Sequence, residues 1–147
     1  MIDFESEFIK SQGQPFAIDG KEYYMCYSIH VPKETWIKIK FISAISAPRQ
    51  GVRVDADKPL EWRNRKGNSI NIWYPYKKEE HETTIFCPEE TSINVRNIWD
   101  NGDGVVQSWH GGGAMIVEEN NGNRLFCCNS TLTNDRCSDC IFRILFQ

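Results

Sequence analysis

Hydrophobic and polar side chains alternate along most of this chain. Between residues 36 and 45, Ile37, Ile39 and Phe41 fall on one side, and lysines fall between them. Residues 92–99 repeat the pattern. A period of two residues is typical of a β-strand with one buried face, whereas a helix would repeat every 3.6 residues. The pattern therefore predicts a series of β-strands.

Two dipeptides mark tight turns between such strands. Asp-Gly at residues 19–20 and Asn-Gly at residues 121–122 suit two-residue hairpin turns, because both central residues of those turns adopt positive φ. A further turn is expected around Lys-Gly-Asn at residues 66–68. Each hairpin turn fixes the pairing of its strands, with the cross-strand partners Phe16–Tyr23 and Val117–Phe126.

The number and spacing of these segments predict an all-β fold. We expect about eight to ten strands, which suits an antiparallel β-sandwich of the jelly-roll or immunoglobulin-like type; a closed β-barrel is the alternative. Two short segments have some helical character: residues 1–12, where Phe4 and Phe8 are four positions apart, and residues 77–82. With 147 residues the chain has the usual size of one domain, so residues 1–147 are expected to form a single β domain.

Composition and charge indicate which classes of partner to expect. Hydrophobic residues make up 40% of the chain and charged residues 25%, a balance typical of folded domains, and the net charge is -3. A nucleic-acid partner is therefore not predicted, and no apolar stretch is long enough for a transmembrane segment. The first residues are acidic where a signal peptide would be basic, which favours a cytoplasmic protein; a signal peptide already removed would make it extracellular.

Four of the six cysteines gather near the C-terminal end of the chain. Cys137 and Cys140 have the Cys-x-x-Cys spacing of a zinc site, and Cys128 is the candidate third ligand. Cys127 precedes Cys128 directly, so in a regular strand their side chains point to opposite faces and cannot share one ion. A fourth ligand would come from Cys26, Cys87 or a histidine. The alternatives are a disulfide between Cys128 and either Cys137 or Cys140, and free thiols that fill the core.

The segment that follows residues 92–99 concentrates side chains suited to ligand binding. Its candidate ligand-binding residues are Trp99, Asp100, Asn101, Asp103, Trp109 and His110. Indole rings stack on the apolar faces of sugars, while carboxylates and amides bind sugar hydroxyls, so this composition favours a carbohydrate. The Asp and Asn side chains also resemble calcium ligands, but they lack the spacing of an EF-hand, so only a looser calcium loop fits. The alternative is an ordinary β-loop with side chains that form turns and indoles that are buried.

A glycine-rich run, His110-Gly111-Gly112-Gly113, resembles the oxyanion-hole loop of lipases and esterases. That family needs a Gly-x-Ser-x-Gly nucleophile elbow, which this sequence lacks, and the chain is too short and too rich in strands for that fold. The glycines are therefore better explained by positive φ or by a close approach of two backbone segments. No phosphate-binding loop or dinucleotide fingerprint is present, so catalysis has little support.

These observations favour a non-enzymatic ligand-binding module. The expected ligand is a carbohydrate, bound by loops at one end of a β-sandwich. The second hypothesis is a protein–protein interaction module, such as an inhibitor, immunity or assembly protein; it would use edge strands or the aromatic run Trp73–Tyr76, and it would allow an oligomer. The third is a small zinc-containing protein or enzyme built around the cysteines.

Overall fold

The computed structural model describes residues 1–147 as nearly all antiparallel β-structure, as the alternating pattern predicts. In chain order the elements are α1 (Phe4–Lys10), β1 (Phe16–Ile18), β2 (Lys21–Tyr23), β3 (Tyr27–Val31), β4 (Thr35–Ala44), β5 (Arg49–Trp62), β6 (Arg65–Trp73), the 3-10 helix η1 (Lys78–Glu80), β7 (Glu82–Cys87), β8 (Thr91–Asp100), β9 (Val106–Gln107), β10 (Ala114–Asn120), β11 (Asn123–Asn129) and β12 (Cys140–Phe146). Neither helix has the length and hydrophobicity of a membrane span.

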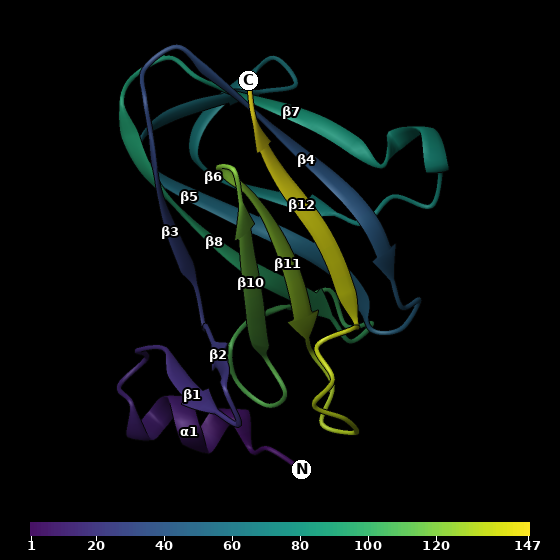
Figure 1. Cartoon of the computed structure of the whole chain (residues 1–147). Helices are drawn as coiled ribbons and strands as arrows, with labels where there is room; N and C mark the ends of the chain where they lie inside the picture. The colour runs from purple at the N-terminus through teal and green to yellow at the C-terminus, as the bar shows by residue number, and fades with distance from the viewer.

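One long sheet curls on itself to form a half-barrel (Figure 1). Its strands lie in the order β10-β11-β12-β4-β7-β5-β8-β3, while β6 pairs with β5 and β9 pairs with β8 beside this path. Strands from opposite ends of the chain lie side by side, because β12 pairs antiparallel with β4. Pairing between strands that are far apart in the sequence therefore determines which side chains become neighbours on the sheet.

Strand β5 bends in its middle. Its register with β6 shifts between Asp55 and Leu60. Before the bend β5 pairs with β8, and after it Glu61 pairs with Phe86 of β7. The alternation of side chains restarts at a register shift, so one strand looks like two in the sequence. The bend lets β5 belong to both halves of the curled sheet.

A single strand from Tyr23 to Val31, as the sequence predicts, is not formed: β2 ends at Tyr23 and β3 begins at Tyr27. Tyr24 leaves the strand direction and forms an isolated bridge to Met115 of β10, with N–H···O distances of 2.8 and 2.9 Å. This bridge joins the chain just before β3 to β10, which lies at the opposite end of the strand order. The two ends of the curled sheet are therefore joined by backbone hydrogen bonds at this bridge.

The inner face of the curl holds the main hydrophobic core. Ile37, Ile39 and Phe41 are at most 3% exposed, as their alternation predicts. Phe126 and Phe142 stack within the same core, with ring centroids 4.7 Å apart and planes 6° apart. Full burial of an aromatic or aliphatic side chain of this size contributes about 1.5–3 kcal/mol, so these inward residues hold the curl together.

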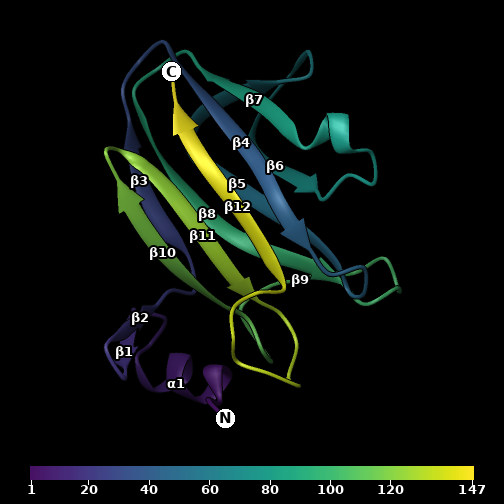
Figure 2. The ribbon, with the colours of Figure 1, turned by 45° about the vertical axis from the view of Figure 1, so that its right-hand side comes forward.

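Helix α1 and the β1-β2 hairpin cover one end of the curled sheet (Figure 1, Figure 2). The helix begins after Asp3, whose carboxylate accepts the Ser6 N–H at 3.1 Å. Phe4 and Phe8 are one turn apart and are buried with Tyr23 in a second, smaller hydrophobic cluster. The cross-strand partners predicted for both hairpins are confirmed.

Candidate functional site

The loop after β8 uses its carboxylates to shape its own backbone. Asp100 Oδ1 accepts the N–H groups of Gly102 at 2.8 Å and Gly104 at 3.1 Å. Asp103 Oδ1 accepts the N–H of Val105 at 3.0 Å. These are turns in which an Asp side chain replaces a backbone acceptor. The predicted site residues Asn101 and Asp103 are exposed within this stretch of turns, and Asp100 is half-buried.

The aromatic members of the same loop gather in a cluster. The ring centroid of His110 lies 6.1 Å from that of Trp99 and 6.1 Å from that of Trp109. Trp99 is only 3% exposed, so its indole packs inside the protein, whereas Trp109 is half-buried and His110 is exposed. Of the predicted aromatic residues, His110 therefore offers the most surface to a ligand.

The glycine-rich run has the structural role expected from the sequence. Gly111 has a φ of 63°. A Cβ at Gly112 would overlap the carbonyl of Thr131, and a Cβ at Gly113 would lie 2.7 Å from Trp99 Cη2 and 2.8 Å from Trp109 Cα. The run therefore combines a left-handed backbone with two close approaches, as predicted for these residues.

The predicted zinc ligands divide between the two hydrophobic clusters. Cys128 and Cys140 are cross-strand partners in the main core, whereas Cys137 lies in the smaller cluster with Phe4. Burial raises the pKa of Cys137 and of Cys140 to about 12, and it raises that of Cys128 well above its usual value. All six cysteines are free thiols here, and no group of three or more His, Cys, Asp or Glu side chains is placed to hold a metal ion. The sequence-predicted zinc and calcium sites thus have no assembled ligand set, and the carboxylates of the loop after β8 accept backbone N–H groups instead.

A groove on the outer face of the sheet has the composition of a binding site. We call it the Trp36 groove; it is lined by Trp36 of β4, Thr84 and Phe86 of β7, and residues 61–66 at the β5-β6 turn, and it encloses about 450 Å³. This volume lies within the usual range of about 300–1,000 Å³ for small-molecule sites. It brings together three segments that are far apart in the sequence.

Strand pairing builds the aromatic floor of the Trp36 groove. Trp36 and Phe86 are cross-strand partners on β4 and β7, with ring centroids 4.8 Å apart. Trp36 is 48% exposed, although it is a large apolar side chain. Trp62 also lines the groove; it packs against the main core, and its Nε1–H donates to Thr83 Oγ1 at 2.7 Å. The floor is therefore held by the sheet and is ready for a flat apolar ligand surface.

The β5-β6 turn places cations at the rim of this groove. Arg63 and Asn64 are its central residues, with φ values of 50° and 62°, which is the geometry of a two-residue hairpin turn. The turn expected at residues 66–68 is therefore wrong, and those residues belong to β6. The Arg63 guanidinium lies 4.6 Å from the ring centroid of Trp62, and Arg65 and Lys66 follow it on β6.

The sequence contained a signal for Trp36. It shares the parity of Lys38 and Lys40, which alternate with the buried Ile37 and Ile39, so a strand here places Trp36 on the outer face. The neighbour Phe86 follows the same rule on β7. The pairing of β4 with β7, which brings the two outward aromatic rings together, could not be predicted from the sequence.

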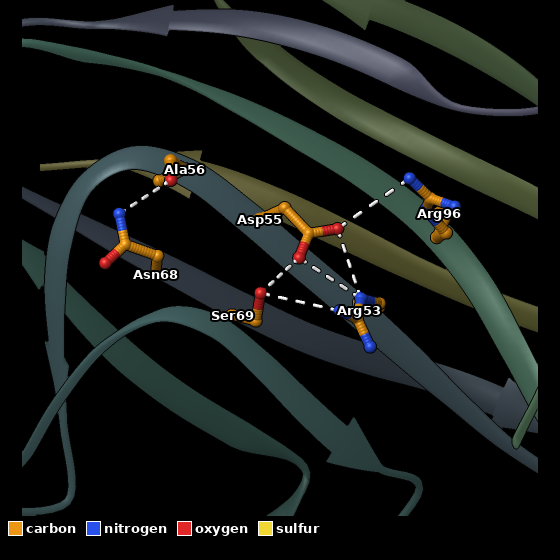
Figure 3. Close-up of polar contacts among 6 residues, drawn as sticks. All are labelled: Arg53, Asp55, Ala56, Asn68, Ser69 and Arg96. Atoms are coloured by element: carbon orange, nitrogen blue, oxygen red, sulfur yellow. Dashed lines mark hydrogen bonds and ion pairs between the residues drawn. The ribbon is translucent and has the colours of Figure 1, made fainter.

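A polar network on the outer face of β5, β6 and β8 is a weaker candidate (Figure 3). Asp55 receives the Arg53 Nε–H at 3.1 Å, lies 3.8 Å from Arg96, and accepts the Ser69 hydroxyl. Burial alone would raise the pKa of Asp55, but the hydrogen bonds from Ser69 and Arg53 and the charges of both arginines outweigh it and lower the pKa. Because these groups satisfy one another, the network favours a structural role over ligand binding.

The aromatic run Trp73–Tyr76 is mostly covered. The Arg49 guanidinium lies 4.8 Å from the Trp73 ring centroid, and Tyr74 packs with its ring centroid 4.8 Å from that of His81. Only Tyr76, at 85% exposed, projects into solvent. The predicted aromatic patch is thus reduced to one free ring.

A buried polar cluster holds residues 130–139 in place. Asn129 Nδ2 donates to the Gly112 carbonyl at 2.8 Å, and Asn129 Oδ1 accepts the Cys137 N–H at 3.2 Å. Asp139 Oδ2 accepts the backbone N–H groups of Ser130 at 2.8 Å and Thr131 at 3.1 Å. Both side chains bind backbone groups on neighbouring loops, so this cluster is scaffold.

Comparison with known proteins does not assign the chain to a family. No protein-family model matches the chain, and no curated protein matches its sequence. The function is therefore argued from the Trp36 groove and from the loop after β8.

Proposed function

We propose that this protein is a non-enzymatic carbohydrate-binding module and that the Trp36 groove holds the sugar. The observation that carries the proposal is Trp36 itself, an indole that is 48% exposed on a rigid β-sheet beside a groove of about 450 Å³. An exposed indole stacks on the apolar face of a sugar ring at little entropic cost, because the sheet already holds it.

The polar residues of the groove support binding more than catalysis. Its lining contains one carboxylate, that of Glu61, together with Asn64, Thr84 and basic side chains. Hydrolysis of a glycosidic bond by the usual route needs a pair of carboxylates that flank the bond. Hydroxyl, amide and guanidinium groups instead supply the hydrogen bonds that fix a sugar in one orientation.

The loop after β8 is the second place where a sugar could bind, since it carries the residues that the sequence favoured. Binding of the full chain to a panel of oligosaccharides separates the two sites. We expect Trp36→Ala to abolish binding, while His110→Ala in the loop and Tyr76→Ala, an exposed aromatic outside the groove, retain it. Loss of binding in His110→Ala alone would place the site in the loop, and no binding by the wild-type protein to any glycan would overturn the proposal.

A protein partner is the alternative function, and one observation favours it. Strand β6 pairs only with β5, so the opposite edge of Arg65–Trp73 is free to receive a strand from another chain. A second copy of this protein would give a dimer through this edge. Sedimentation analysis over a range of protein concentrations tests this case, and a monomer at all concentrations would exclude the dimer.

For the architecture, we infer that the curled sheet is closer to a sandwich than to a closed barrel. The bend of β5 supports this, because it separates a half that contains β8 from a half that contains β7. The single bridge between Tyr24 and Met115 favours the barrel alternative. A sandwich leaves its outer faces available, which is where the Trp36 groove lies.

A further inference from the structure

We infer that the ligand of the Trp36 groove is an acidic saccharide, whose carboxylate or sulfate groups pair with the cations at the rim, Arg63, Arg65 and Lys66. This inference rests on the proposed function and names the chemical class of its ligand. Two observations carry it: the position of these cations at the groove beside an exposed indole, and their lack of carboxylate partners.

The β5-β6 turn places the three cations along the rim of the groove. Arg63, Arg65 and Lys66 all line the groove, and all three are exposed. The Arg63 guanidinium lies over the Trp62 ring, 4.6 Å from its centroid, and makes no ion pair. Stacking of this kind prepares a guanidinium for the two parallel hydrogen bonds that a carboxylate or sulfate accepts.

None of these three cations has a carboxylate partner in the structure. No ion pair involves Arg63, Arg65 or Lys66. Glu61 is the only acid that lines the groove, and it makes no ion pair with Lys66 although the two residues are cross-strand partners. The rim therefore carries an excess of positive charge.

Two other cations on the outer face are paired, whereas the exposed Arg143 of β12, the cross-strand partner of Lys40, makes no ion pair. On β4, Lys38 and Lys40 lie 3.7 and 3.6 Å from the carboxylate of Glu82 on β7. The chain as a whole has a net charge of -3, so acidic residues are available, yet Glu61 is the only one that lines the groove. An unpaired basic cluster beside an exposed indole fits a ligand that supplies both a flat apolar face and an anion.

The size of the groove favours a saccharide over a nucleic-acid strand. Proteins that bind single strands use several stacking platforms along an extended basic channel. This groove has one exposed indole, Trp36, over about 450 Å³. That room suits one or two sugar rings, and the cations at its rim can pair with anionic groups on those rings.

The experiment compares matched ligands that differ only in charge. Oligosaccharides of several uronic acids, each paired with its neutral methyl ester, are titrated into the full chain by calorimetry, together with a sulfated disaccharide, a single-stranded oligonucleotide and an acidic peptide. We expect acids to bind at least about tenfold more tightly than their esters, the size of one charge-assisted hydrogen bond, and the difference to shrink at raised salt. The sulfated arm shows whether the site accepts both anionic groups.

Variants connect the effect to the rim. The double variant Arg65→Gln with Lys66→Gln should remove the preference for acids, while Lys38→Gln with Lys40→Gln, on the same face but paired with Glu82, should keep it. If acids and esters bind equally well and Trp36→Ala abolishes the binding of both, the carbohydrate-binding function is supported and the preference for an acidic ligand is refuted. If no saccharide binds, or the oligonucleotide or peptide binds more tightly than every saccharide, both proposals fall.

Discussion

Replacement of Gly112 by alanine tests how the loops around residues 109–113 and 130–139 are joined. A Cβ at Gly112 would overlap the backbone carbonyl of Thr131. The overlapping group is backbone, so no side chain can rotate away to make room. The Gly112 carbonyl also accepts the buried Asn129 side-chain amide at 2.8 Å, and separating the loops would break that bond.

The expected cost has two parts. Inserting a methyl group into a packed site costs about 1–3 kcal/mol, and loss of the partner of a buried amide costs about 1–3 kcal/mol. Gly112→Ala should therefore lower the free energy of unfolding by about 2–6 kcal/mol. Gly111→Ala is the matched control: it has a φ of 63° but open space around its Cβ, so only the left-handed backbone penalty of about 1–2 kcal/mol applies.

Urea unfolding followed by tryptophan fluorescence measures both variants under the same conditions. The reasoning requires a clearly larger fall in the unfolding midpoint for Gly112→Ala than for Gly111→Ala. Equal midpoints for the two variants would show that backbone conformation, and not a close approach to Thr131, selects glycine at position 112. The placement of residues 130–139 would then be wrong.

Two further predictions concern charge and the thiols. Asp55→Asn should lower the free energy of unfolding by about 1 kcal/mol at pH 7, because its ion pairs are partly exposed. The pKa of Asp55 is lowered in the folded protein, so the stability that its carboxylate contributes is present above its ordinary pKa of about 4 and is lost as the pH falls through the folded pKa. The difference between the urea midpoints of Asp55→Asn and wild type should therefore be smaller at pH 3 than at pH 7, and an equal difference at both pH values would contradict this. A thiol reagent at pH 8 should label the half-buried Cys26 in native protein, while Cys128 and Cys140 react only in urea because burial raises their pKa; intact mass after labelling counts the modified thiols, and rapid native labelling of all six would refute the packing of the core.

Local signals in the sequence predicted the features that depend on neighbours in the chain. The alternation around Ile37 and Ile39 identifies a strand and its buried face. The Asp-Gly and Asn-Gly turns give both hairpin registers, because turn type alone fixes which residues face each other. The glycines at positions 111–113 were explained correctly for the same reason, since a left-handed backbone or a close approach excludes other residues.

Features that depend on long-range pairing could not be read in this way. The bend in β5 between Asp55 and Leu60 resets the alternation, so the strand looked like two. The β5-β6 turn uses Arg63 and Asn64 in left-handed conformations, whereas Lys-Gly-Asn at residues 66–68 gave the stronger turn signal. Gly67 instead sits within a strand, where tertiary pairing overrides local preference.

The two candidate sites show that the exposure and free hydrogen-bonding groups of a residue indicate a binding site better than its residue type does. The loop after β8 was favoured because it concentrates Trp, Asp, Asn and His, yet Trp99 is 3% exposed and Asp100 already accepts two backbone N–H groups. Trp36 belongs to an ordinary strand, but 48% of it is exposed and the cations beside it have no partners. A ligand gains binding energy only from surface and hydrogen-bonding capacity that the folded chain has not already used. By that criterion the Trp36 groove is the stronger site, and its unpaired arginines make the charge of the ligand the property to measure first.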